Sequence, residues 1–355
     1  MEKTKWHILC EKDVGLFSLI QQVVAHIPLA ISEDRIPLAL YGNSCCYWTP
    51  EGHRGKDNVW EYYFEPINPD YPASSIDESI RIHIRNKPPH FQYPGYSINE
   101  SVFVSNNFGD HPSFKGKTLK IPYKWADPDE ALRRRASQII ETYVRPRAYI
   151  LEKVTQFYQE HLAGQYVIGV HMRATDVTDS QEHNIHRRGS YKLERYLRQI
   201  DELLQNHPDA KIFAATDSLK ALEGLKEAFN EKVLHASTIY HASEKVSGTG
   251  PLGGVIPGYL SGDSQKAAQN GEEAVIDYLL LSKCQYLVHN GSGLARTALL
   301  KNADLAHHNI HSKTEYVKTL WRLDSQELRP FLKFSYRHLL QNMKKPIKRL
   351  INWDK

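Results

Sequence analysis

The stretch Tyr166–Asp179, YVIGVHMRATDVTD, predicts how the chain folds. Its first part, Tyr166–Val170, is an apolar run rich in β-branched residues, which is typical of a strand buried on both faces of a parallel sheet. Polar residues then follow, among them His171, Arg173 and Asp176. Because ligands bind beyond the carboxyl ends of the strands in an open α/β sheet, these residues are placed to meet a substrate. The alternative is an ordinary strand end with solvated polar side chains.

The second half of the chain alternates between strand and helix signals. Apolar runs predict strands at Tyr166–Met172, Ala210–Ala215, Val233–Ala236 and Gln285–His289. Helical periodicity predicts helices at Tyr191–Asn206, Leu219–Phe229, Glu272–Lys283 and Gly293–Lys301. Alternation of this kind indicates an α/β fold, with a parallel sheet that carries helices on both faces.

The first residues predict a β-loop-α-β unit. Trp6–Cys10 and Ile36–Tyr41 are strand-like, and apolar residues recur with helical period from Leu16 onward. Gly15 precedes this helix and is either a turn residue or a point where backbone approaches a ligand. The next segment, Gly42–Ile67, is rich in aromatic residues. They either pack a small satellite core or line a sugar-binding groove.

The middle of the chain has weak strand signals at Ile80–Ile84 and Thr118–Ile121. A long helical segment is then expected, with Asp127 as its N-cap and Pro128 at the first helical position. It breaks at Pro146, resumes, and ends near residue 163. We place the boundary between the two halves there.

Composition describes an ordinary globular protein of 355 residues, with 41% hydrophobic and 24% charged residues. This length suggests two domains. A net charge of +4 is too small to indicate a nucleic-acid partner. The spacing of the cysteines does not match a metal site. The N-terminus lacks the apolar core of a signal peptide, so we expect a cytoplasmic protein.

Three expected strand ends carry polar groups: His171–Asp176, Thr216–Ser218 and His289–Gly293. Consecutive strand ends lie along one edge of a doubly wound sheet. Thr216–Ser218 can be explained as a helix N-cap alone. The start of the helix at Gly293, however, also presents backbone N–H groups, which favour phosphate. Together the three ends predict a site for a nucleotide phosphate.

These residues also resemble a known family. Gly169–Asp176 (GVHMRATD), Phe213–Asp217 (FAATD) and Ala274–Ser282 (AVIDYLLLS), with Ser292 beyond them, resemble motifs of the fucosyltransferase superfamily in the same order. The most similar branch is the α1,6-fucosyltransferases, which include the rhizobial nodulation fucosyltransferase. Gly15–Ser18 (GLFS), followed by Gln21 and Gln22, is similar to the donor-side glycine loop of that family.

The resemblance implies a GT-B fold, in which two Rossmann-like domains face a cleft and the second holds the GDP-sugar. On this basis residues 1–162 would be an acceptor-side domain with a long helical segment. Residues 163–320 would bind the nucleotide sugar. Residues 321–355 would form a C-terminal helix and basic tail that return to the first domain. The family implies neither a metal nor a cofactor.

The same resemblance assigns roles to residues. Arg173 and the helix start at Ser292 would stabilise the diphosphate. The implied donor-binding set is Gly15, Phe17, His171, Arg173, Asp176, Thr216, Asp217, Asp277, Ser292 and Gly293. Asp217 and Asp277 would anchor the nucleoside, although Asp277 lies among apolar neighbours and is alternatively a buried structural acid.

Two assignments stay open. Relatives carry a second basic residue where this chain has Ala174, so one phosphate contact is either missing or replaced by Arg296 or Arg188. The general base implied by the family is Glu182. Its rivals are Asp179 and His183, because a base must reach the acceptor hydroxyl and the sequence does not show that geometry.

The function implied is an inverting, metal-independent transfer of fucose from GDP-fucose to a hydroxyl of a glycan or lipid-linked glycan. The alternatives are a transferase for another nucleotide sugar and a silent glycan- or nucleotide-binding protein. The basic, apolar tail Phe331–Trp353 either packs as a helix or gives weak peripheral contact with an anionic membrane through Lys344–Lys355.

Overall fold

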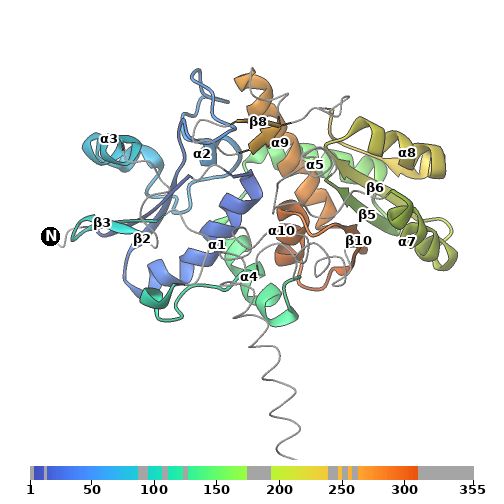
Figure 1. Ribbon diagram of the computed structural model, residues 1–355, viewed down its shortest axis with the longest axis horizontal. Helices are drawn as coiled ribbons and strands as arrows, with labels where there is room; N and C mark the ends of the chain where they lie inside the picture. Colours follow the sequence, from blue (N-terminus) through green and yellow to red (C-terminus); the bar gives the residue numbers. More distant parts are fainter. Residues whose placement is uncertain are drawn as a thin grey trace, which may run out of the picture.

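The computed structural model describes residues 4–11, 14–86, 95–105, 111–122, 127–173, 193–238, 247–249, 255–257 and 263–310. Two sheets lie side by side, and helices α1, α9 and α10 fill the space between them (Figure 1). These helices are α1 (Leu16–Ser32), α9 (Ser264–Leu281) and α10 (Gly293–Lys301). The α/β class predicted from the sequence is therefore confirmed.

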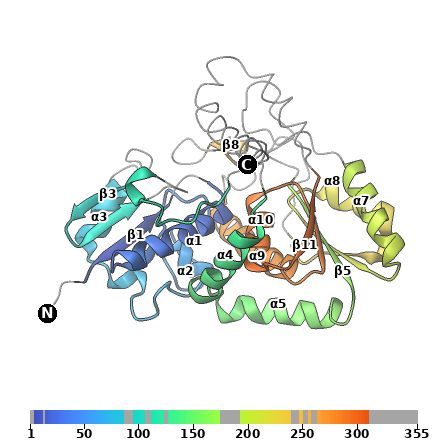
Figure 2. The same ribbon diagram turned by 90° about the horizontal axis from the view of Figure 1, so that it is seen from below.

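The first sheet has the strand order β2-β1-β4-β3. Its strands are β1 (Trp6–Cys10), β2 (Ile36–Leu40), β3 (Tyr96–Asn99) and β4 (Val102–Ser105). β1 is parallel to both β2 and β4, and β3 is antiparallel to β4. The predicted β-loop-α-β start is confirmed, whereas β3 and β4 were not expected from the sequence. Helix α3 (Glu78–Asn86) covers the outer face of this sheet (Figure 2).

The second sheet has the order β11-β10-β5-β6-β7, and every pair is parallel. Its strands are β5 (Val167–Met172), β6 (Lys211–Thr216), β7 (Val233–Leu234), β10 (Tyr286–His289) and β11 (Ala306–Asn309). β5 lies in the centre and is buried along its whole length, which explains its unbroken apolar run. Gly169 lets α9 approach this strand, since a Cβ there would lie 2.9 Å from Cδ2 of Leu281.

Helices α7 (Leu193–Asn206) and α8 (Leu219–Phe229) cover the outer face of the second sheet. A short antiparallel pair, β8 (Ser247–Thr249) and β9 (Val255–Pro257), lies apart from both main sheets. The inner faces of the two sheets share one apolar core, which runs from Leu16 and Phe17 on α1 to Leu299 on α10. The parallel sheet with helices on both faces is thus confirmed.

The helical segment after residue 127 forms α4 (Glu130–Tyr143) and α5 (Ala148–His161). α4 packs on α10 and α5 packs on α9. In Figure 2, α5 runs beneath the second sheet. The expected N-cap is wrong, because Asp129 accepts the hydrogen bond from the Leu132 amide at 2.8 Å. Asp127 lies two residues earlier, outside the helix.

The strand signal at Ile80–Ile84 is also wrong, since these residues belong to α3. Isoleucine at every second position resembles a strand. In the helix, however, Ile80 and Ile84 share the face that packs on the first sheet, while Ile82 is 48% exposed. Thr118–Ile121 forms no strand either. The amide of Leu119 instead donates to the carbonyl of Ala25 on α1 at 3.0 Å.

Helix α9 begins eight residues before the predicted start. Its first turns contain small and polar residues with little apolar periodicity, so the sequence pattern does not reveal them. They are helical because they pack on α2 (Val59–Tyr63): the hydroxyl of Tyr63 donates to the carbonyl of Ala268 at 2.8 Å. Gly271 permits this approach, since a Cβ there would lie 2.2 Å from that hydroxyl.

Glu272 on α9 ties the first half of the chain to the helices beneath the second sheet. Its carboxylate accepts hydrogen bonds from Nε of Arg54 at 3.0 Å and from Lys153 on α5, and lies 3.1 Å from Nε2 of His53. Burial alone would raise the pKa of Glu272, but these three hydrogen bonds outweigh it and hold the pKa well below its usual value. Arg54 also covers the ring of Tyr149 at 4.1 Å.

Candidate functional site

The carboxyl ends of the central strands lie next to one another. Backbone register places His171 of β5 between His289 of β10 and Ala215 of β6. Met172 is paired with Thr216. The three polar strand ends that the sequence singles out therefore meet at one edge of the sheet, as predicted.

A tight turn connects β10 to α10. Gly291 has φ +67°, the left-handed conformation that glycine adopts most readily, and its amide donates to Nδ1 of His289 at 3.0 Å. The side-chain amide of Asn290 donates to the carbonyl of Arg173 at 3.0 Å, which joins this turn to the end of β5. Ser292 caps α10 by accepting from the Ala295 amide at 3.1 Å.

Ser292 also links the helix start to the central strand. Its Oγ lies 3.0 Å from Nδ1 of His171, and both residues are buried. The strand end at His171 and the helix start at Ser292, both singled out in the sequence, are thus joined by a hydrogen bond. The positive end of the α10 dipole faces the edge of the sheet at this point.

The first turn of α1 lies beside the first turn of α10. The side-chain amide of Gln21 donates to the carbonyl of Gly293 at 2.9 Å and to Oγ1 of Thr297 at 3.0 Å. A Cβ on Gly293 would lie 3.4 Å from Cβ of Phe17, so the glycine keeps the helices close. Two helix N-termini, with Gly15 exposed at one of them, therefore stand together near Arg173.

Tyr47 connects Arg173 to the start of α1. Burial raises the pKa of Tyr47; the positive charge of Arg173 and a hydrogen bond with the backbone of Leu16 oppose this rise. Tyr47 comes from the aromatic segment for which the sequence left two roles open. Its members Trp60, Tyr62, Tyr63 and Phe64 are buried core residues, whereas Tyr47 and Trp48 are only partly buried. Sequence reasoning missed this role of Tyr47.

Asp277 is a buried acid on α9. Its Oδ2 accepts from the hydroxyl of Ser237 at 2.6 Å, and its Oδ1 has no hydrogen-bond partner among the described residues. Burial raises the pKa of Asp277 to about 8, which the bond from Ser237 opposes and the charge of Glu273 reinforces. The next residue, Tyr278, packs against Phe17 at a ring distance of 5.5 Å. Asp277 is thus a buried acid near α1, and its nucleoside role stays a prediction.

The neighbouring candidates occupy the ends of other elements. Thr216 is buried, and its Oγ1 accepts from the amide of Ser218 at 3.2 Å. Ser218 in turn caps α8. Asp217 lies between them and is partly buried. The capping explanation is confirmed for Ser218, and a donor contact for Thr216 or Asp217 stays a prediction.

Two arginines fix the position of α10 by hydrogen bonds to backbone carbonyl groups, one from the middle of the helix and one at its C-terminal end. Arg296 is 2% exposed and donates to the carbonyl of Pro122 at 2.7 Å. At the other end, the guanidinium of Arg133 on α4 donates to backbone carbonyls of Leu299 at 3.2 Å, Asn302 at 2.9 Å and Leu305 at 2.6 Å. A cation at a helix C-terminus stabilises the helix dipole and satisfies its last carbonyl groups.

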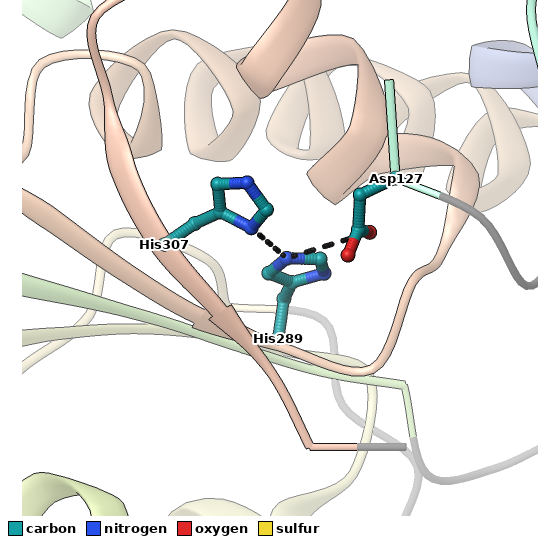
Figure 3. A group of neighbouring side chains, drawn as sticks. All are labelled: Asp127, His289 and His307. Carbon is teal, nitrogen blue, oxygen red and sulfur yellow. Dashed lines mark hydrogen bonds and ion pairs between the residues drawn. The ribbon is translucent and has the colours of Figure 1, made fainter. Parts of the chain in front are cut away.

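His289, His307 and Asp127 form the cluster that could hold a metal ion (Figure 3). Nε2 of His289 lies 3.1 Å from Nδ1 of His307 and 3.9 Å from Oδ1 of Asp127. Because Gly291 donates to Nδ1 of His289, the neutral ring carries its proton on Nε2. A cation bound at Nε2 would need the lone pair of that atom, so the ring proton would have to move to Nδ1. The N–H group at Nδ1 would then face the N–H group of Gly291, and their hydrogen bond would be lost. The cluster therefore fits a hydrogen-bond chain better than a metal centre.

Several predicted residues lie outside the described ranges. These are Asp176, Asp179, Glu182, His183 and Arg188, together with the tail after residue 310. The choice of base, the second basic contact and the membrane role of the tail therefore stay predictions. Among the described residues, no helix is long and apolar enough to cross a membrane.

Solved structures of fucosyltransferases are similar to the chain. Fucosyltransferase NodZ from Bradyrhizobium aligns at 16% identity with a TM-score of 0.46, over 83% of this chain and 92% of that one. POFUT1 in its apo form aligns at 12% identity with a TM-score of 0.49, over 87% and 99%. No protein-family model and no curated protein matches the chain. The function is therefore inferred below from this chain's own residues.

Proposed function

We propose that the chain is a glycosyltransferase that moves fucose from GDP-fucose to a hydroxyl of a glycan. The observation that carries this proposal is the pairing of two helix N-termini with an arginine at the carboxyl edge of a parallel sheet. Gln21, on the second turn of α1, donates to the carbonyl of Gly293 at the start of α10, and Asn290 donates to the carbonyl of Arg173 at the strand end. Such an arrangement suits a diphosphate, which carries charge on closely spaced oxygens.

The chemistry of the reaction agrees with this arrangement. The acceptor hydroxyl would attack the anomeric carbon of fucose, the bond from that carbon to the diphosphate oxygen would break, and GDP would leave. A base, proposed as Glu182, would take the proton of the hydroxyl. Arg173 and the N–H groups that begin α10 would stabilise the charge that develops on the diphosphate. We further propose that the reaction inverts the anomeric carbon and needs no metal.

The motif resemblance supports the same donor. GVHMRATD and AVIDYLLLS hold Arg173 and Asp277, and Tyr278, which follows Asp277, packs against Phe17 of α1. A transferase for another nucleotide sugar is the second candidate, because Ala174 stands where relatives carry a basic residue. A nucleotide panel separates the two candidates, since a ligand that binds only the native state raises its melting temperature.

The experiment is a thermal-shift series with GDP, UDP, CMP and GDP-fucose, with and without EDTA. We expect GDP and GDP-fucose to raise the melting temperature in both conditions, and UDP and CMP to leave it unchanged. A response to UDP alone would favour the second candidate. A response lost with EDTA would contradict metal independence. Release of GDP from GDP-fucose in the presence of glycan acceptors then tests catalysis directly.

A further inference from the structure

A separate pocket of about 260 Å³ opens beyond the carboxyl ends of β1 and β2. Glu11 follows β1, and Gly42 and Asn43 follow β2. The lining of the pocket includes Arg81, Ile84 and Arg85 of α3 and the segment that begins at Trp48. In parallel sheets this is the position where ligands bind. The proposed donor site does not use it, and its size suits a sugar ring better than a whole nucleotide.

Glu11 is a fixed hydrogen-bond acceptor in this pocket. The residue is buried, and its Oε1 accepts from the amide of Gly42 at 3.1 Å. Burial raises the pKa of Glu11, while bonds from its own amide and those of Gly42 and Ser44 oppose the rise. A carboxyl group held by backbone in this way presents its oxygens in one orientation. Polar groups with defined directions of this kind provide specificity in a small pocket.

The other wall supplies donors. Arg81 on α3 lies 3.3 Å from Oδ2 of Asp57 and 3.8 Å from Oε2 of Glu78. Its Nε is buried and has no hydrogen-bond partner among the described residues. A guanidinium group carries five N–H donors, and the two ion pairs of Arg81 use only part of them. Arg85, one turn further along α3, also lines the pocket.

The charges around the pocket balance. The lining has two basic residues, Arg81 and Arg85, and two acidic residues, Glu11 and Asp57. It therefore has no excess positive charge that would attract a phosphate or a carboxylate. A neutral ligand with many hydroxyl groups can instead donate to the carboxylates and accept from the guanidinium groups. Trp48 adds a large flat apolar surface, which suits the C–H face of a pyranose ring.

One loop connects this pocket to the proposed donor site. Trp48 lines the pocket, while its neighbour Tyr47 is close enough to Arg173 for the positive charge to lower the pKa of its hydroxyl, and hydrogen-bonds with the backbone of Leu16. A sugar in the pocket would therefore pack on the same loop that lies near the arginine of the proposed donor site. We propose that the pocket binds a neutral sugar residue of the acceptor glycan, held by Glu11, Arg81 and Trp48. This inference rests on the proposed transferase function.

The test is saturation-transfer NMR on the full chain with the methyl glycosides of glucose, galactose, mannose, N-acetylglucosamine and fucose. We expect at least one glycoside to receive saturation from the wild type. Trp48→Leu and Glu11→Gln should each reduce that signal at least fivefold, with the GDP-induced shift in melting temperature unchanged. Trp6→Leu and Glu33→Gln, which change the same residue types outside the pocket, should keep the signal.

Each other outcome is decisive. The pocket assignment is overturned if no glycoside receives saturation, if both pocket variants keep the wild-type signal, or if inorganic phosphate displaces the glycoside. Circular dichroism identifies a variant that fails to fold, in which case the other pocket variant decides. Failure of the transferase proposal looks different, because the wild type would then show no stabilisation by GDP whatever the glycosides do.

Discussion

The backbone amide of Gly291 donates a hydrogen bond to Nδ1 of His289 at 3.0 Å. This bond fixes the ring, because the proton of the neutral imidazole must then lie on Nε2, which points at His307. Burial lowers the pKa of His289 well below its usual value, and the charges of nearby histidines lower it further, so the ring is neutral at physiological pH. The turn that begins α10 is therefore held by one defined tautomer.

A matched pair of substitutions tests whether this bond orients the donor site. The side-chain oxygen of His289→Asn can take the place of Nδ1 and accept from Gly291, whereas His289→Gln places its amide near Nε2 and loses that acceptor. We expect the asparagine variant to bind GDP with nearly wild-type affinity. We expect the glutamine variant to bind at least fivefold more weakly, since an unsatisfied buried amide costs about 1–3 kcal/mol. Calorimetric titration measures both affinities.

The tautomer itself is open to measurement without any ligand. Nitrogen NMR of the histidine rings should show a bare Nδ1 and a protonated Nε2 for His289. A protonated Nδ1 would contradict the hydrogen-bond chain and reopen the cluster to metal binding. Equal GDP affinities in the two variants would leave His289 with a purely structural role.

The raised pKa of Asp277 predicts that a proton is released when GDP binds. Its pKa of about 8 means that the buried carboxyl is mostly protonated at pH 7. The N–H groups of guanine would favour the ionised form, so GDP binding should expel a proton. Titrations in buffers of different ionisation enthalpy measure this directly. Asp277→Asn should abolish the proton release. Binding without proton release in the wild type would support the structural-acid explanation.

The same carboxyl predicts a pH dependence of stability. In the folded chain the pKa of Asp277 lies near 8, and in the unfolded chain it lies near 4. Between these values the folded state binds one more proton, so the contribution of Asp277 to stability is present below about pH 4 and is lost as pH rises through 8. Asp277→Asn should flatten this decline in denaturant unfolding at pH 5 and pH 8. An unchanged slope would contradict the raised pKa.

Arg173 should not tolerate lysine. A single ammonium group cannot reproduce the two-pronged contact of a guanidinium group with phosphate. We expect Arg173→Lys to lose most of the GDP-fucose turnover and to keep the wild-type melting temperature, because the side chain lies at a strand end. Turnover close to wild type would return Arg173 to the role of a solvated surface residue.

The depressed pKa of Glu272 predicts that the folded chain loses stability at acidic pH. Its pKa is depressed in the folded chain, so its contribution to stability is present above the unfolded value near 4.3 and is lost as pH falls below it. Glu272→Gln should lower the free energy of unfolding at pH 7 by about 2 kcal/mol, because the buried group loses its charge-assisted hydrogen bonds from the half-exposed side chains of Arg54 and Lys153. The exposed Glu152→Gln on α5 is the control and should have little effect. A difference between variant and wild type that stays constant from pH 7 to pH 3 would contradict this assignment.

The base is tested by a series of substitutions. Glu182→Gln should reduce turnover by about 10²-fold, with little change in GDP affinity. Asp179→Asn and His183→Ala provide the comparison. If one of them shows the larger loss and Glu182→Gln does not, the role of base moves to that residue.

The sequence predicted best where one physical signal dominates. Leu219–Phe229 and Gly293–Lys301 form helices with the expected bounds, because a capping serine precedes each of them. The alternating isoleucines at Ile80–Ile84 wrongly predicted a strand, because helix and strand periodicities cannot be told apart over such a short stretch. The start of α9 depends on contacts with Tyr63, which no local pattern contains.

Some residues of the candidate site could be predicted from local sequence signals, whereas others depend on tertiary packing. Residues at strand ends can be identified because parallel topology brings such ends together, as the pairing of His171 with His289 shows. The resemblance singled out Gln21, but its hydrogen bonds to α10 could not be predicted, because they depend on packing between parts of the chain that are distant in sequence. The same holds for the position of Tyr47 near Arg173. Arg296 was considered as a phosphate ligand. Its burial against Pro122 is likewise visible only in three dimensions.

The packing of α4 and α5 determines where the chain can be cut. Arg133 on α4 hydrogen-bonds to the end of α10, and α5 packs against α9. α4 and α5 both precede the second sheet in the sequence. A fragment that starts at residue 163 would leave the apolar sides of α9 and α10 open to water and invite aggregation. One that starts at residue 127 would keep the covering that α4 and α5 provide, and would lose the contacts of α1 with α10 and of α2 with α9. Recombinant expression of the second half of the chain should therefore begin before Asp129.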